Sequence, residues 1–258
     1  LICKNESTRT EEKMVQVTKY EKEYVIRSYE CNKNSVLRIV TLLNIFQDIA
    51  DEHASKMELG LEYCLSRGLA WVGSNYHIKI NRLPKIHEQI KIITWPSEEK
   101  KLGAIRDFRV INTGGEDLIQ ASSQWILINF EKKRPVCLRD NLPEYSAIEE
   151  RALQTDFPRL PDLEKIDYRR EFHVRFDDID LNQHVNNAVY PLWATESVDP
   201  ELRLNHSTAE LEICFKKEGH YGEQVEALTQ MTEPMTSLHS IKSLNDGREL
   251  SRIRIKWR

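Results

Sequence analysis

The stretches YVIRSYE at residues 24–30 and FHVRFDD at residues 172–178 share one pattern, and this repetition decides the fold. Each reads as a short strand, and each precedes an apolar stretch. A unit that occurs twice in one chain is expected to fold the same way twice. The sequence therefore predicts two similar halves.

In the first half, residues 36–57 carry apolar side chains at intervals of three and four, which predicts a helix with Ser35 as its N-cap. Alternation of apolar and polar residues further along predicts several strands. They are expected at residues 76–80, 90–94, 108–110 and 119–130.

In the second half, residues 187–197 predict a helix. Pro191 is tolerated only in a first turn, so this helix is expected to begin late or to be kinked. Asp246-Gly247 predicts a hairpin between two strand-like runs. The proline-rich residues 131–168 look like a connection. Each half is thus expected to hold a strand, one long helix and several antiparallel strands, which is an α+β class.

Composition excludes several classes of protein. The 258 residues include 37 Lys and Arg and 41 Asp and Glu, a net charge of −4. No apolar run is long enough for a transmembrane helix. Only 9 glycines are present, and neither phosphate-binding glycine motif occurs. We therefore expect a soluble globular protein that does not bind nucleic acid or span a membrane.

The cysteines and the first residues point to the cytoplasm. Five widely spaced cysteines without a C-x-x-C pair favour reduced thiols and disfavour a zinc site. They are Cys3, Cys31, Cys64, Cys137 and Cys214. The chain begins at Leu1, residues 5–13 are polar and expected to be disordered, and no secretory signal is seen.

The densest polar cluster spans residues 178–187 and precedes the second predicted helix. Asp180, Asn182 and His184 offer an acceptor, an amide and a ring that titrates near neutral pH. The same residues could equally form an Asx-rich turn that caps the helix, the role expected for Asn186 and Asn187. Spacing alone leaves both interpretations open.

Ordered motifs along most of the chain resemble those of the acyl-ACP thioesterases, which release fatty acids in plastids and many bacteria. Besides the opening strand and DLNQHVNN at 180–187, the matching motifs are NIFQD at 44–48, EH at 52–53, LAWV at 69–72, RDF at 106–108 and ASSQW at 121–125. The resemblance implies a tandem double hot-dog, in which each half is a curved antiparallel sheet around a long helix. It also implies three parts, an N-terminal domain at 14–135 that forms the acyl pocket, a linker at 136–165 and a catalytic C-terminal domain at 166–258.

The resemblance further implies a thioesterase that releases fatty acid from acyl-acyl carrier protein and so ends fatty acid synthesis. Its active-site positions fall on Asp180, Asn182, His184 and Glu218, the last within FKKEG at 215–219. Gly219 stands where plant members carry a cysteine, and Cys214 is expected on the other face of its strand from Phe215. We therefore favour a carboxylate mechanism over a cysteine nucleophile.

In the mechanism that we expect, Glu218 and His184 together hold and deprotonate a water, and Asn182 either orients that water or donates to the developing oxyanion. Backbone N–H groups near Asn186 polarise the thioester carbonyl. Asp180 either positions this network or attacks to give an anhydride. The equivalent stretch of the first half, CNKNS at 31–35, lacks the cluster and is expected to be inactive, while residues 39–57 and 57–61 would line the acyl pocket.

Acyl carrier protein is acidic, so a basic face is expected on the enzyme. The candidate cations are Lys100, Lys101, Arg106, Lys132, Lys133, Arg134, Arg169, Arg170, Lys216 and Lys217. No cofactor and no metal are expected, and a homodimer stays open.

Two other functions stay under consideration, and two more are disfavoured. A hot-dog enzyme that acts on acyl-CoA would use similar groups. A non-catalytic acyl-binding module would keep the pocket without needing His184 and Glu218. A metal site is disfavoured because the cluster has one histidine and no cysteine, and a serine hydrolase because no G-x-S-x-G motif occurs.

Overall fold

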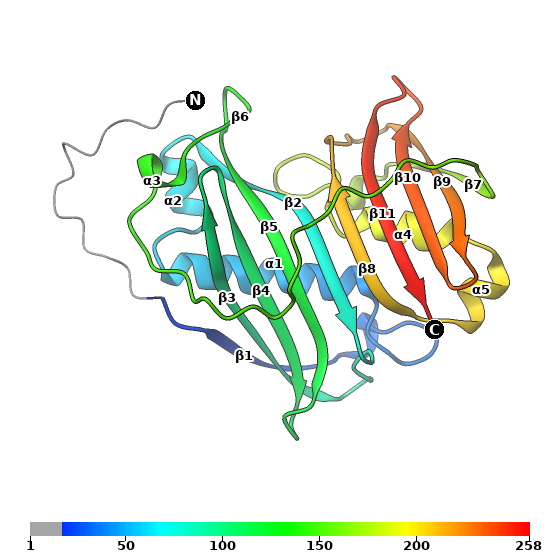
Figure 1. Ribbon diagram of the computed structural model, residues 1–258, viewed down its shortest axis with the longest axis horizontal. Helices are drawn as coiled ribbons and strands as arrows, with labels where there is room; N and C mark the ends of the chain where they lie inside the picture. The colour runs from blue at the N-terminus through cyan, green and yellow to red at the C-terminus, as the bar shows by residue number, and fades with distance from the viewer. Residues whose placement is uncertain (1–16) are drawn as a thin grey trace.

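One continuous antiparallel sheet of 11 strands organises residues 17–258, the part that the computed structural model describes. Its strand order is β1-β3-β4-β5-β2-β8-β11-β10-β9-β7, with the short β6 paired to β5. In Figure 1, α1 lies behind the strands of the first half and α4 behind those of the second. The expected disorder of residues 5–13 concerns residues outside the described part.

The first half wraps its strands around α1. Its elements are β1 (Tyr20–Val25), a 3-10 turn (Ser28–Glu30), α1 (Ile39–Lys56), α2 (Leu61–Ser66), β2 (Leu69–Ile80), β3 (Gln89–Lys100), β4 (Gly103–Asn112), β5 (Asp117–Asn129), β6 (Arg134–Pro135) and α3 (Leu138–Asn141). The predicted period places the apolar side chains of α1 on the sheet, where Phe46 stacks on Phe108 with ring centroids 4.5 Å apart. Burial of this face holds the helix in the curve of the sheet.

The predicted start of this helix, and Ser35 as its cap, are wrong. The helix begins at Ile39, and Arg38 is the N-cap residue. Val36 and Leu37 instead form β-bridges with Lys85 and Cys31, so they cannot join the helix. Ser35 lies in the turn before them with φ 58°.

The second half repeats the arrangement with a shorter helix. Its elements are β7 (Tyr168–His173), a 3-10 turn (Phe176–Asp178), α4 (Val189–Glu196), α5 (Pro200–Asn205), β8 (Thr208–Phe215), β9 (Gln224–Glu233), β10 (Thr236–Ser243) and β11 (Glu249–Trp257). Pro191 falls in the first turn of α4, so the predicted late start is confirmed. Pro200 then opens a separate α5 behind Asp199, whose carboxylate accepts the Glu201 N–H. The predicted hairpin at Gly247 is confirmed between β10 and β11.

The halves join edge to edge, because β2 pairs with β8. Apolar side chains of both halves, among them Ile78 and Leu211, belong to one core. The connection after α3 crosses the face of the sheet opposite the helices (Figure 1), where Arg151 lies 2.9 Å from Asp107. The boundaries of the two domains stay a prediction.

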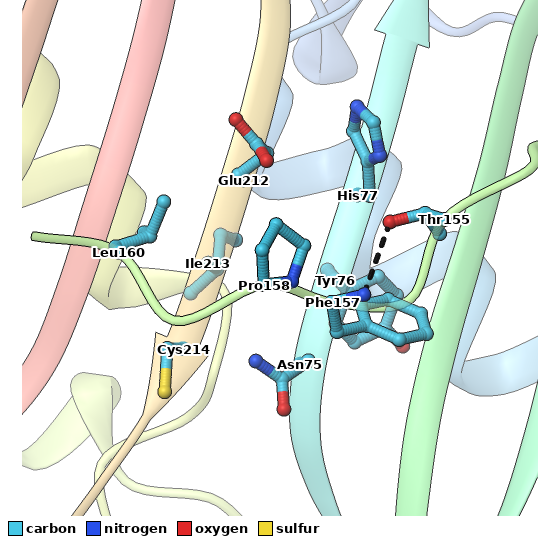
Figure 2. Close-up of a pocket in the computed structure, with 10 residues that line it drawn as sticks. All are labelled: Asn75, Tyr76, His77, Thr155, Phe157, Pro158, Leu160, Glu212, Ile213 and Cys214. Carbon is cyan, nitrogen blue, oxygen red and sulfur yellow. Dashed lines mark hydrogen bonds between the residues drawn. The ribbon is translucent and has the colours of Figure 1, made fainter.

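Figure 2 shows residues 155–160 of this connection lying over β2 and β8. The cavity beneath it measures only about 10 Å³, too small for an acyl chain. Cys214 lines this side, whereas Phe215 packs on Tyr190 on the helix side. The predicted opposite orientation of Cys214 and Phe215 is therefore confirmed.

Candidate active site

The polar cluster forms a tight turn whose ends pair as a β-bridge between Ile179 and Val185. Inside it, Oδ1 of Asp180 accepts the N–H groups of Asn182 at 2.8 Å and of His184 at 3.4 Å. Gln183 completes the turn with φ 63°. The Asx-turn interpretation therefore holds for Asp180, which shapes the loop that carries His184.

The structure brings His184 and Glu218 together. Glu218 follows β8, and the next residue, Gly219, accepts the Val185 N–H through its carbonyl at 2.9 Å. This backbone contact places the two side chains side by side, with His184 Nε2 3.1 Å from Glu218 Oε2. The side chains are 23% and 39% exposed, so a water molecule can reach both.

Two further charged or titratable side chains contact this pair, and the sequence did not predict their contacts. Lys133 Nζ lies 2.9 Å from Glu218 Oε2. The His220 ring meets the His184 ring edge-on at a centroid distance of 5.3 Å. In the sequence Lys133 is one member of a basic run, and no local pattern predicts that the β5–β6 turn reaches the second half.

The environment fixes the charges of the pair. Burial lowers the pKa of His184 below its ordinary value, outweighing the opposite effect of the Glu218 carboxylate. Burial alone would raise the pKa of Glu218, but the Lys133 hydrogen bond and the nearby His184 and His220 outweigh it, so its pKa is lowered. At neutral pH the site therefore presents a carboxylate beside a neutral imidazole, which can accept a proton.

Asn182 is not brought to this pair. Its residue is exposed, and among residues 17–258 no hydrogen bond joins its side chain to His184 or Glu218. The Asn186 N–H donates to the Asp178 carbonyl at 2.8 Å, so the backbone N–H expected to polarise the thioester carbonyl would have to come from a residue beside Asn186. The amide side chain of Asn186 links the halves by donating to Asn44 Oδ1 of α1 at 3.3 Å.

The start of α4 leaves the Asn187 amide available. The N–H groups of Ala188 and Val189 donate to Asn186, to its side-chain and backbone oxygens respectively. The Asn187 N–H has no hydrogen-bond partner within the described part of the chain. Its side chain lies against Gly73 of β2, where an added Cβ would meet Asn187 Nδ2 at 3.1 Å. Asn187 can therefore offer an N–H to a developing oxyanion.

Gly219 fits its position closely. A Cβ there would lie 3.0 Å from Val185 Cγ2 and 3.2 Å from the Tyr190 hydroxyl. The Gly219 N–H donates to that hydroxyl at 3.2 Å. A cysteine at this position would require these neighbours to move by a few tenths of an ångström.

A curved sheet around a helix, with an imidazole and a carboxylate at the helix start, defines a hot-dog hydrolase. Two family models match the chain, the acyl-ACP thioesterase N-terminal domain over residues 17–145 and the C-terminal domain over residues 163–258. The chain therefore belongs to the acyl-ACP thioesterase family.

Individual proteins agree with this assignment. Oleoyl-acyl carrier protein thioesterase 1 of Arabidopsis thaliana is 26% identical, over 93% of this chain and 76% of its own length. An acyl-[acyl-carrier-protein] hydrolase of Cuphea viscosissima is 30% identical over 93% of this chain and 62% of its own length. The 12:0-ACP thioesterase of Umbellularia californica superposes with a TM-score of 0.82 at 25% identity, covering 93% of this chain and 97% of that structure.

The predicted α+β double hot-dog and the predicted enzyme class, an acyl-ACP hydrolase, are confirmed by these matches. Among residues 17–258, no helix has the length and apolar character needed to cross a membrane.

Proposed function

We propose that Glu218 and His184 activate the water that hydrolyses an acyl-acyl carrier protein thioester, releasing a free fatty acid. The observation that carries this proposal is the 3.1 Å contact between His184 Nε2 and Glu218 Oε2. An ionised carboxylate and a neutral imidazole side by side are suited to take a proton from water near neutral pH.

In the proposed reaction, the water oxygen attacks the thioester carbonyl carbon while one water proton passes to the Glu218–His184 pair. The Asn187 N–H donates to the oxyanion that forms. The intermediate then collapses, the carbon–sulfur bond breaks, and the proton passes to the leaving sulfur. The products are the fatty acid and the free thiol of the carrier.

Asp180 contributes in two ways to this proposal. Its Oδ1 holds the turn, and its negative charge favours the protonated form of His184. Since one of its oxygens is committed to the backbone, we favour this positioning role over attack on the thioester. We propose that Asn182 contacts a water or the thioester-bearing group of the carrier, because its side chain is exposed beside the turn.

Each of the three expected parts of the chain has its own role in this proposal. We propose that residues 14–135 form the acyl pocket around α1, that 136–165 are the linker, and that 166–258 carry the chemistry. A cytoplasmic location and a homodimer stay predictions, which cell fractionation and a mass measurement in solution test.

The test is a release assay with a panel of acyl carrier proteins. The relatives are named for 12:0, palmitoyl and oleoyl chains, so the panel spans these lengths. We expect the wild type to release fatty acid from acyl carrier protein, and Glu218→Ala and His184→Ala each to lose orders of magnitude in kcat while staying folded. Near-normal activity in both variants would defeat the assignment of these residues.

The same assay separates the alternatives. Faster release from acyl-CoA than from the carrier with the same chain would favour an acyl-CoA thioesterase. Tight binding of an acyl chain with no release from either carrier would favour a non-catalytic module.

A further inference from the structure

One side chain of the first half enters the site of the second half. Lys133 lies in the turn between β5 and β6, and its Nζ is 2.9 Å from Glu218 Oε2. This is the same oxygen that lies 3.1 Å from His184 Nε2. Two nitrogen atoms from opposite halves of the chain therefore lie close to one carboxylate oxygen, and the Lys133 ammonium donates a hydrogen bond to it.

We propose that Lys133 is a positioning residue for thioester hydrolysis, which holds Glu218 against His184 so that the first half completes the active site. This inference rests on the function proposed above. It gives the first half a part in the chemistry as well as in binding the acyl chain.

The geometry around Glu218 supports such a role. Arg248 donates to the backbone carbonyl of Glu218 through Nη2 at 3.2 Å and Nε at 3.4 Å, which fixes its main chain. Lys133 then fixes its side chain through Oε2. The other oxygen, Oε1, is left to contact the attacking water. Lys133 itself has φ 47°, so the turn that presents it has a defined backbone.

The charges around the carboxylate act in the same direction. Lys133, His184 and His220 all face Glu218 and lower its pKa. Lys133 also lowers the pKa of His184. Without the lysine, both groups would hold their protons to higher pH, and the form with an ionised Glu218 and a neutral His184 would be lost earlier on acidification.

The exposure of the pair separates this role from a structural one. The side chains of Lys133 and Glu218 are 58% and 39% exposed. Ion pairs that are this accessible add little to the stability of a fold. Removal of the lysine is therefore expected to change the kinetics much more than the melting temperature.

The experiment compares Lys133→Ala and Lys133→Arg with Lys165→Ala, a matched control that removes an equally exposed lysine from an ion pair outside the site, the one with Asp167 at 3.0 Å. Each variant is assayed across pH on acyl carrier protein and on a small thioester, acyl-N-acetylcysteamine. We expect Lys133→Ala to lose about tenfold to 100-fold in kcat on both substrates, since misplacing a catalytic group costs rates of this order. Its acid limb should move to higher pH, Lys133→Arg should restore most of the rate, and Lys165→Ala should keep wild-type kcat and its pH profile.

Two results would overturn the inference. One is wild-type kcat and an unmoved acid limb in Lys133→Ala. The other is a loss in Lys133→Ala that appears only with acyl carrier protein and not with the small thioester, which would assign Lys133 to carrier docking. A wild type that releases no fatty acid, or a fully active Glu218→Gln, would instead refute the proposed function itself.

Discussion

The two halves build the same turn, and only one of them carries the side chains that we propose to be catalytic. In the first half Asn32 Oδ1 accepts the N–H groups of Asn34 at 2.9 Å and of Val36 at 3.4 Å. In the second, Asp180 makes the two equivalent bonds at 2.8 and 3.4 Å. The turns share a left-handed residue before their last position, with φ 58° and 63°.

The backbone beyond the turns matches too. The Leu37 N–H donates to the Pro84 carbonyl at 2.9 Å, as that of Val185 does to Gly219. By this register Val36 occupies the place of His184, and Leu83 the place of Glu218. The comparison separates architecture from chemistry, because the Asx turn occurs in both halves and the imidazole–carboxylate pair in one.

The largest expected effect comes from making the second half resemble the first. His184→Val with Glu218→Leu should lower kcat about 10²- to 10⁴-fold or more, since general acid–base groups contribute on this scale. The fold should persist, because the first half accommodates Val36 and Leu83 in the same backbone. Fatty acid release and thermal unfolding of the double variant test this, and an unfolded protein would contradict the equivalence of the two turns.

Substitutions can separate the two roles of Asp180, the hydrogen bonds that hold the turn and the charge that acts on His184. Asp180→Asn keeps the turn, as Asn32 does in the first half, but removes the charge that favours protonated His184. We expect unchanged unfolding and a loss of several-fold in kcat, because without the Asp180 charge the pKa of His184 falls further and its protonated form is less favoured.

Asp180→Ala should in addition lose about 1 kcal/mol of stability with its hydrogen bonds, and Asn32→Ala should lose a similar amount without loss of kcat. Inactive but stable Asp180→Asn would indicate that this carboxylate attacks the thioester.

Each half also buries a histidine whose pKa is strongly lowered, His53 in the first and His239 in the second, and both are expected to destabilise the protein in acid. Burial lowers the pKa of His53 to about 4 and that of His239 to about 3. Below pH 6.5 the unfolded chain binds protons that the folded one cannot, so stability should fall as the pH drops from about 6.5 towards 4.

The slope should be about 1.4 kcal/mol per pH unit for each histidine. Denaturant titrations at several pH values measure this slope. His53→Gln and His239→Gln should each lower it by about 1.4 kcal/mol per pH unit. A stability that does not change between about pH 6.5 and pH 5 would show that the histidines protonate while folded.

The smallest expected effect lies at the contact between the halves. Gly73→Ala would place its Cβ 3.1 Å from Asn187 Nδ2 and 3.6 Å from the Trp125 ring. A shift of a few tenths of an ångström in Asn187 should lower kcat about twofold to fivefold and leave KM unchanged. Steady-state kinetics check this, and a change in KM alone would place Asn187 in substrate binding.

The sequence was informative wherever local pattern decides structure. The period of residues 39–56 placed α1, and the repeated opening strands predicted two similar halves. It failed at Ser35, because pairing of the following residues with Cys31 and Lys85 is a tertiary event. The contact of Lys133 with Glu218 could not be predicted from the sequence for the same reason, since these residues are 85 positions apart.

Thioester hydrolysis is proposed to take place at only one of the two equivalent turns, the one in the second half. The most direct measurement compares kcat on acyl-acyl carrier protein for His184→Gln and for Val36→Gln, the same side chain introduced at the two matching positions. We predict that His184→Gln loses about 10²-fold or more, whereas Val36→Gln stays within a few-fold of wild type. Equal losses in both variants, or an active His184→Gln, would contradict the assignment of catalysis to the second half.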